Sequence, residues 1–470
     1  MRDRLQDHHP EGKFMPTSTS TPPLQVTRDL VRAVLDHQRD DLPSAIDVHA
    51  RMHLLNVLAL TVSAARQPAV EAVVQLQSAV GGAGVTVVPG RSERLDRLLA
   101  PVAIGVAAHL DDFDDTHLAT VIHPSAAALA TVLPVGIMAG SSGRDVLHAF
   151  AWGCEVQLRV GLAMSPSHYD AGWHITGTAG VIGCAVAAGL LLGLDETALG
   201  WAVGLAASSA VGHRQAFGTM TKPLHPGKAA SNGVLAALLA RDGFTGPDTV
   251  LEAPRGYFEV LSTHTELSTV LDGIGESWHF SDNAVKPYPC GIVAHPLIDA
   301  GLELRRLGVE PKRVVGLRVC CNPLVPDLMG HRDPIDGLQA RFSAVHGIAS
   351  ALLDGEVGLP SYETERVRSD DAIAMRALVE LVPTTTCARD AAMVRAELDD
   401  GSTVIADVAH ARGSIARPLS AQEVRAKAEA LLAPVLGRAW LAVPEAVDGL
   451  PRAQDLEQLC LATTLSEDGR

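Results

Sequence analysis

Cysteine and aromatic residues are scarce in this chain of 470 residues, and their scarcity excludes several classes of protein. The seven cysteines form no Cys-x-x-Cys pair and lie mostly in apolar runs, which argues against a disulfide scaffold and against a cysteine-based metal site. Phe, Trp and Tyr together make up 4% of the residues, so little material is present for a pocket lined with aromatic faces. We expect reduced, buried thiols in a cytoplasmic protein.

Positive charge is also in short supply. Lys and Arg number 38 against 54 Asp and Glu, and the formal net charge is −16. This balance offers no basic surface to a nucleic acid or to an anionic membrane, and neither is expected as a partner. If the substrate is itself an anion, the few Lys and His residues in otherwise neutral segments become the candidates for binding it.

Long, strongly apolar runs are missing as well. The first 25 residues are polar and lack the apolar stretch of a secretory signal, so residues 1–24 are expected to form a disordered leader. The longest apolar runs, such as residues 178–194, are rich in Ala and Gly and too short for a membrane span. We expect buried helices there and no membrane association.

What the chain does have is helical periodicity over its first half. Between about residues 26 and 270, apolar residues recur at helical spacing. Segments 126–140 and 178–194 are apolar all round, which is typical of helices at the centre of a large core or at an oligomer interface. Helices are expected at 26–37, 43–65, 68–79, 93–111, 124–140, 143–164, 175–194, 196–212 and 226–242.

The pattern changes near residue 281. Strands are expected at 313–320 and in a hairpin over 392–408 that turns at Asp400 and Gly401, with a helix at 294–307 before the first strand and another at 342–354 before the hairpin. Ser420 and Glu423 then have the spacing of a capping box, which starts a further helix.

These patterns predict a mainly α protein with an α+β lid. A large Ala-rich helical domain would comprise residues 25–280 together with the C-terminal helices of residues 413–470. A smaller α+β lid domain, residues 281–412, would be inserted into it.

The densest group of acids is the run of Asp111, Asp112, Asp114 and Asp115. It could be a solvated helix end, or it could place a carboxylate beside His117 or His123 for proton transfer. A third interpretation is the DDxxD motif of Mg²⁺-dependent prenyl diphosphate enzymes, formed by Asp111, Asp112 and Asp115. The low aromatic content and the lack of a second metal motif argue against this third interpretation.

Cations lie in turns that glycine and proline shape. The basic candidates are His174 in the segment GWHITGT, Lys222 and His225 in GTMTKPLHPGK, Lys286 and His295 in KPYPCGIVAHP, and His346 in FSAVH, and Tyr288 is a polar candidate between Lys286 and His295. The segment around Lys222 contains two prolines and is expected to be a rigid loop.

Taken in order, the segments DDFDDTHLATVIHPS, GWHITGTAG, GTMTKPLHPGK, KPYPCGIVAHP and FSAVHGIASALLDG resemble the MmgE/PrpD family. That family includes 2-methylcitrate dehydratases, cis-aconitate decarboxylases and iminodisuccinate epimerases. The resemblance covers roughly residues 26–460. It implies a homodimeric enzyme that needs no metal ion and no cofactor, with a large helical domain and a smaller lid.

The resemblance also implies an active site between the two domains. The residues that match those of the decarboxylases are Asp112, Thr116, His123, His174, Lys222 and His295. Two positions depart from the decarboxylase pattern. His346 stands where the decarboxylases have Tyr, and the interval from Thr116 to His123 is one residue longer than theirs.

Dehydration, decarboxylation and epimerisation of a small polycarboxylate share one difficulty, which is the negative charge that develops on a carboxylate. Fixed cations and donors stabilise such charge, and losing one donor costs about 2.7 to 4 kcal/mol. We assign this role to Lys222, His225 and His295, and proton transfer to His123 or His174, with Asp112 orienting its partner. Further substrate contacts are expected from Thr116, His225, Lys286, Tyr288 and His346.

The sequence therefore predicts a metal-independent lyase, either a dehydratase or a decarboxylase, that acts on a small di- or tricarboxylate. An epimerase or isomerase using the same site is the first alternative. A Mg²⁺-dependent prenyl diphosphate enzyme and a helical scaffold without catalytic activity are the others.

Overall fold

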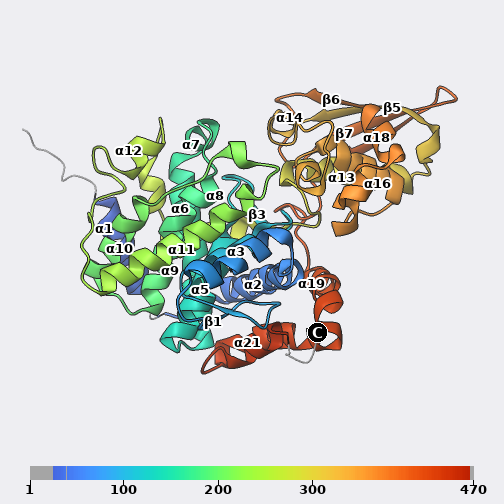
Figure 1. Ribbon diagram of the computed structural model, residues 1–470. Coiled ribbons are helices and arrows are strands. Elements are labelled where there is room, and N and C mark those ends of the chain that lie inside the picture. The colour runs from blue at the N-terminus through green and yellow to red at the C-terminus, as the bar shows by residue number, and fades with distance from the viewer. Residues whose placement is uncertain (1–24, 39, 466–470) are drawn as a thin grey trace, which may run out of the picture.

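The computed structural model describes residues 25–38 and 40–465, which pack around two main hydrophobic cores (Figure 1). The larger core is built from side chains of residues 26–280 and 428–459. The second core is built from residues 288–408. The leader expected at residues 1–24 lies outside the described residues.

Helices form nearly all of the larger unit. Most of α5 and α9 is buried on every side, because these helices carry Ala, Val, Leu and Gly around their whole circumference. The helices are α1 (Val26–His37), α2 (Ser44–Ala64), α3 (Pro68–Val80), α4 (Leu99–His109), α5 (Pro124–Ala139), α6 (Gly143–Met164), α7 (Ser167–Asp170), α8 (Ile175–Thr178), α9 (Gly180–Leu191), α10 (Glu196–Ala207), α11 (Thr221–Arg241), α12 (Tyr257–Leu261), α19 (Ala421–Leu436), α20 (Ala442–Gly449) and α21 (Glu457–Thr463).

Most of the expected helices are confirmed, and α1 and α6 have the expected bounds. The helix expected at 93–111 begins only at Leu99, because Arg94 and Leu95 form a short strand, β2 (Arg94–Leu95), that pairs with β1 (Thr86–Val87). Local periodicity cannot detect this pairing, since the two strands are too short to show a pattern.

The prediction of a rigid loop around Lys222 is wrong, because the structure places Lys222 in the first turn of α11. Pro223 lies in the first turn of the helix, where its missing N–H has no intrahelical partner to lose. Pro226 lies further inside the helix. The helical spacing puts Lys222 and His225 on the same face, three residues apart.

The second unit is a four-stranded sheet covered by helices. Its strand order is β6 (Val379–Pro383), β5 (Val314–Cys321), β7 (Ala392–Leu398) and β8 (Thr403–Val408). The strand β5 runs parallel to β6 and antiparallel to β7. The predicted hairpin of β7 and β8 is confirmed, and Gly401 takes the left-handed conformation at its turn. The strand β6 was not expected.

Six helices accompany this sheet. The helix α13 (His295–Arg306) packs against β7 and β8, and α16 (Ala344–Asp354) packs against α13. Figure 1 shows the sheet and these helices set to one side of the larger helical unit. They are α13 (His295–Arg306), α14 (Leu324–Leu328), α15 (Gly337–Ala340), α16 (Ala344–Asp354), α17 (Thr364–Val367) and α18 (Asp370–Ala377).

The chain returns to the larger unit after β8. The capping box is confirmed, since the Ser420 hydroxyl accepts from the Glu423 amide and the Glu423 carboxylate accepts from the Ser420 amide. From there α19 runs along α2. The structure is thus mainly α with small sheets. The domain boundaries at residues 281 and 412 stay a prediction, which the two separate cores support.

Among the described residues one stretch, Ala421–Arg452, is long and apolar enough to cross a membrane by length and composition, and an 18-residue window within it has a mean hydropathy of 1.4. The pair α2 and α3 passes the same test together but is bent by 77°. Within Ala421–Arg452, α19 and α20 are separate helices with a turn at Gly437 between them, and both contact α2.

The crossing of α4 and α11 depends on two glycines. A Cβ atom added to Gly105 would come within 2.5 Å of the Cα atom of Gly227. This close approach brings the end of α4, which precedes Asp112, next to the start of α11, which carries Lys222.

We predict that Gly105→Ala lowers the free energy of unfolding by about 1–3 kcal/mol, because the added methyl group overpacks the crossing. Gly449→Ala is the matched control, since its Cβ atom would meet nothing within 4 Å, and it should change stability little. The midpoints of thermal unfolding of the two variants test this prediction. Equal midpoints would show that the close crossing is not needed.

Candidate active site

All four aspartates of the 111–115 run are buried, and each has its own partners. Buried carboxylates are tolerated only when they are paired, so this arrangement rules out a solvated helix end. The closest basic partners are Arg341 for Asp111 at 2.6 Å, Lys222 for Asp112 at 2.6 Å, His109 for Asp114 at 2.7 Å, and His53 for Asp115 at 2.7 Å.

Asp112 lies in the turn after α4 and has a left-handed backbone, with φ at 49°. Its Oδ1 atom accepts from the ammonium of Lys222 at 2.6 Å and lies 3.2 Å from that of Lys286. Lys286 also donates to the main-chain oxygen of Asp112 at 3.0 Å. Burial raises the pKa of Asp112, but the two ammonium groups outweigh it and hold this pKa well below its usual range.

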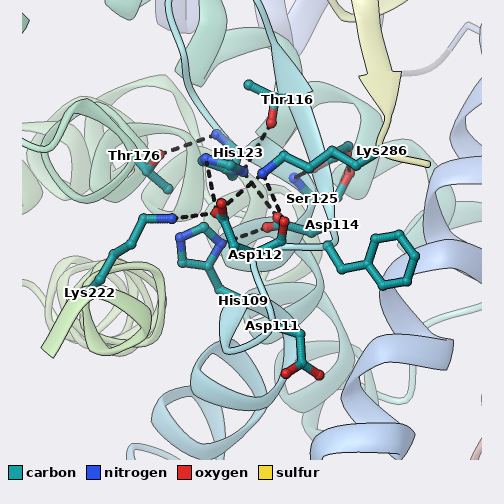
Figure 2. A network of polar contacts seen from close by, with 12 residues as sticks. His109, Asp111, Asp112, Asp114, Thr116, His123, Ser125, Thr176, Lys222 and Lys286 are labelled. Carbon is teal, nitrogen blue, oxygen red and sulfur yellow. Dashed lines mark hydrogen bonds and ion pairs between the residues drawn. The ribbon is translucent and has the colours of Figure 1, made fainter. Parts of the chain in front are cut away.

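Asp114 orients two histidines (Figure 2). Its carboxylate lies 2.7 Å from Nδ1 of His109 and 3.0 Å from Nδ1 of His123. A carboxylate only accepts hydrogen bonds, so each Nδ1 atom carries the proton. In the neutral ring, Nε2 of His123 is therefore left with its lone pair, at 3.9 Å from Oδ1 of Asp112.

His109 and Asp114 are both in their deprotonated forms at neutral pH, which leaves one neutral and the other charged. Burial and the nearby Lys222 lower the pKa of His109 to about 3, so its ring is neutral at physiological pH. Burial raises the pKa of Asp114, but its two histidine partners outweigh that effect and hold the pKa well below its ordinary value. The carboxylate is therefore charged and the ring of His109 is not.

A second pair of histidines lies next to this group. His174, which precedes the short helix α8, has its Nδ1 atom 2.7 Å from Nδ1 of His225 on α11. Burial and the nearby Lys222 both lower the pKa of each ring, and together they bring that of His225 to about 4.

Several of these side chains line one cavity. The other wall comes from the second unit and includes Gly291, Met329 and Phe342. The expected site residues that line the cavity are Asp112, Thr116, His123, His174, Lys222 and Lys286.

The other expected residues do not line this cavity. His225 lies behind His174. His295 has Nε2 3.3 Å from the main-chain oxygen of Cys290, and Tyr288 donates to Asp299 at 2.5 Å. The ring of His346 contacts the main-chain oxygen of Ser361 at 2.8 Å and an Arg376 nitrogen at 3.2 Å. Roles for these four in substrate binding or catalysis stay predictions.

Sequence reasoning missed three residues that shape the site. Asp114 was noted only as a member of the acidic run, and His109 lies inside an apolar helix, where a lone histidine gives no signal. Lys427 on α19 donates to the main-chain oxygens of Phe113 at 2.5 Å and Lys286 at 2.9 Å. It thereby joins the two segments that carry Asp112 and Lys286.

His109, Asp112, Asp114 and His123 have ligand atoms within 4.8 Å of one another, a spacing that could hold a metal ion. The donor set fits such an ion poorly. Two ammonium groups already approach Asp112, and both carboxylate oxygens of Asp114 face Nδ1 atoms of histidines. A dication would have to displace or repel Lys222 and Lys286.

The geometry of a DDxxD diphosphate site is absent from the described residues. Asp111 faces Arg341, whereas Asp115 faces His53, Ser125 and Asn283. Only Asp112 of these three aspartates lines the cavity. The carboxylates therefore do not converge on one Mg²⁺ position.

Comparison with known proteins agrees with this geometry. The MmgE/PrpD N-terminal domain matches residues 28–270, and the MmgE/PrpD C-terminal domain matches residues 288–445. The chain belongs to the MmgE/PrpD family. Its cavity lies where residues matched by both family domains meet.

Several members of the MmgE/PrpD family are similar to this chain over most of their length. The cis-aconitate decarboxylase of Homo sapiens is 30% identical over 79% of this chain and 80% of its own length. A cis-aconitate decarboxylase-like protein of Aspergillus oryzae is 28% identical over 97% and 98%. A cis-aconitate decarboxylase of Aspergillus terreus is 25% identical over 92% and 95%. This membership makes the chain an enzyme of the lyase class, a decarboxylase or a dehydratase.

We predict that acid destabilises the protein already below pH 6.5. Burial lowers the pKa of His117, His168, His225 and His346 to about 4, so the unfolded chain binds these protons at a higher pH than the folded chain does. Their stabilising effect is complete above pH 6.5 and is lost as the pH falls towards 4. Each histidine contributes about 1.4 kcal/mol per pH unit in that window.

Thermal unfolding midpoints between pH 8 and pH 5 measure this effect. His168→Gln removes one titrating group away from the cavity and should make the decline with falling pH shallower. His410→Gln, at a half-exposed ring, should leave the decline unchanged. A midpoint that stays flat down to pH 5 would contradict the prediction.

Proposed function

We propose that this enzyme decarboxylates cis-aconitate or a closely related tricarboxylate. The observation that carries the proposal is the placement of two lysine ammonium groups and two histidine rings on the wall of one cavity. The names of the similar proteins support the reaction, since they are cis-aconitate decarboxylases.

The charges around the cavity suit an anionic substrate. Lys222, Lys286 and Asp112 together carry a formal charge of +1, inside a chain whose net charge is −16. The ammonium of Lys222 also lies 5.5 Å and 5.2 Å from the ring centroids of Phe217 and Phe342. A substrate carboxylate that reaches this corner meets a partly desolvated cation, where charge interactions are stronger than in water.

The reaction needs one proton and one site for negative charge. When the carboxylate on the methylene arm of cis-aconitate leaves as CO₂, the electron pair of the broken C–C bond forms a terminal C=C bond. The former double bond shifts its electrons to the next carbon and its carboxylate, and a proton added to that carbon completes the product. Lys222 and Lys286 would stabilise the charge on that carboxylate.

The two cavity histidines are the candidates for moving the proton. His123 is backed by Asp114, which fixes its tautomer and leaves Nε2 as the group towards Asp112. His174 is backed by another histidine, and either of its tautomers satisfies that contact. We assign delivery of the proton to His174, and to His123 a hydrogen bond that its bare Nε2 atom accepts from a substrate carboxyl or hydroxyl group that carries a proton.

Dehydration of a citrate-like hydroxy acid is the second candidate. It requires a base that removes a proton from carbon and an acid that protonates the departing hydroxyl group. A bare Nε2 atom on His123 and an N–H group on His174 would provide one of each.

The homodimeric state and the cytoplasmic location expected from the sequence also remain proposals.

We predict that the purified enzyme, treated with EDTA, converts cis-aconitate in D₂O to a product with new vinyl proton signals. Proton NMR of separate samples with cis-aconitate, 2-methylcitrate, citrate and iminodisuccinate makes the measurement. Loss of methylene signals from a hydroxy acid would favour dehydration. Deuterium entering an otherwise unchanged skeleton would favour epimerisation, and activity that EDTA abolishes would contradict the metal-independent proposal.

We predict that Asp114→Asn lowers kcat by about 10- to 100-fold, because an amide no longer forces the proton of His123 onto Nδ1 and the hydrogen bond of His123 to the substrate is weakened. Asp115→Asn is the matched control, since Asp115 is equally buried and contacts His53, Ser125 and Asn283 instead of the cavity histidines. Asp115→Asn should lower the unfolding midpoint clearly but should change kcat little. Similar losses of kcat in the two variants would show that Asp114 acts only in stabilising the fold.

A further inference from the structure

The contact between the rings of His174 and His225 differs in kind from the contact between His123, the other histidine that lines the cavity, and the carboxylate of Asp114. The Nδ1 atoms of His174 and His225 lie 2.7 Å apart, and within residues 25–38 and 40–465 no carboxylate is hydrogen-bonded to either ring. A hydrogen bond between two Nδ1 atoms needs a proton on one and a lone pair on the other. Two neutral rings can satisfy this requirement in either direction, whereas a carboxylate can only accept.

We infer that His225 is a relay residue that passes its Nδ1 proton to Nδ1 of His174 while His174 gives its Nε2 proton to the substrate, so that the ring of His174 stays neutral during the transfer. This inference rests on the proposed function, because it assigns His174 as that donor. His225 would be a positioning and proton-transfer residue without contacting the substrate, since it does not line the cavity.

The steps balance with both rings neutral at the start and at the end. At the start, His225 carries its proton on Nδ1 and donates to the bare Nδ1 of His174, which carries its own proton on Nε2. His174 gives the Nε2 proton to the substrate carbon and takes the Nδ1 proton from His225. His225 then takes up a proton from solvent on Nε2. After the product leaves, water in the cavity gives a proton to Nε2 of His174, the Nδ1 proton of His174 returns to His225, and Nε2 of His225 releases its proton to solvent, which restores the starting state.

The surroundings of the pair favour neutral rings. Lys222, His109 and His123 face His174, and Lys222 and His213 face His225. These groups are cationic or can become so, and they disfavour a long-lived second proton on either ring. The proton must therefore pass through without being stored, which is what a two-ring relay does.

Packing holds the ring of His225 in place. A Cβ atom on Gly177 would lie 3.1 Å from Cβ of His225, and one on Gly212 would lie 3.3 Å from its Cγ and Nδ1 atoms. Gly212 has φ at 130°, a conformation that other residues rarely adopt. His225 is 6% exposed and His174 is 1% exposed, so His225 is the outer member of the pair.

Kinetics on cis-aconitate separate a relay from a structural contact. His225→Gln keeps a hydrogen-bonding side chain but cannot pass a proton, and we expect kcat to fall about a hundredfold with little change in KM. His225→Ala should lose as much and should regain at least about tenfold when imidazole is added. The control His168→Ala removes another buried histidine and should gain nothing from imidazole. A His225→Gln variant within threefold of wild type, or no rescue of His225→Ala, would overturn the relay.

A second measurement does not depend on turnover. In protein labelled with ¹⁵N-histidine, NMR should show one strongly downfield Nδ1 proton shared by the pair, which disappears in both His225→Gln and His174→Gln. A His174 tautomer that is unchanged by His225→Gln would overturn the inference. If the wild type acts on no carboxylate, the proposed function fails, while this signal still decides whether the pair shares a proton.

Discussion

The buried ion cluster of Asp112, Lys222 and Lys286 is the interaction on which the rest of the site depends. It ties together the end of α4, the first turn of α11 and the segment after β4 (Asn283–Val285). Removing one partner of such a cluster leaves an unpaired buried charge, which costs about 3–5 kcal/mol. The close crossing of α4 and α11 at their glycines, and the ammonium of Lys427 on two main-chain oxygens, both hold this cluster together.

Around the cluster, two cavity histidines receive different partners. Asp114 fixes the tautomer of His123, because a carboxylate has no proton to give at neutral pH. His225 leaves the tautomer of His174 free to reverse. One wall of the cavity thus combines a fixed hydrogen-bonding group, a reversible one and two cations, which is the set that a lyase of a polycarboxylate needs.

Local signals in the sequence predicted much of the fold. The helices α1 and α6, the capping box at Ser420 and the hairpin turn at Gly401 follow from periodicity or from turn chemistry within a few residues. The prediction of a loop at the start of α11 was wrong, because prolines are favoured both in loops and in the first turn of a helix. Six of the ten expected site residues line the cavity, and all of them except Lys286 are residues that the family resemblance matched.

By itself, the sequence determined the family, the helical character and the charged residues that could form a site. It could not determine which aspartate meets which cation, because Asp112 is 110 residues from Lys222 and 174 from Lys286. Nor could it show that His174 rests against a histidine 51 residues away while His123 rests against Asp114. Only the tertiary structure decided these pairings, since buried charges and ring nitrogens take whichever partners the packing of distant helices brings within hydrogen-bonding distance.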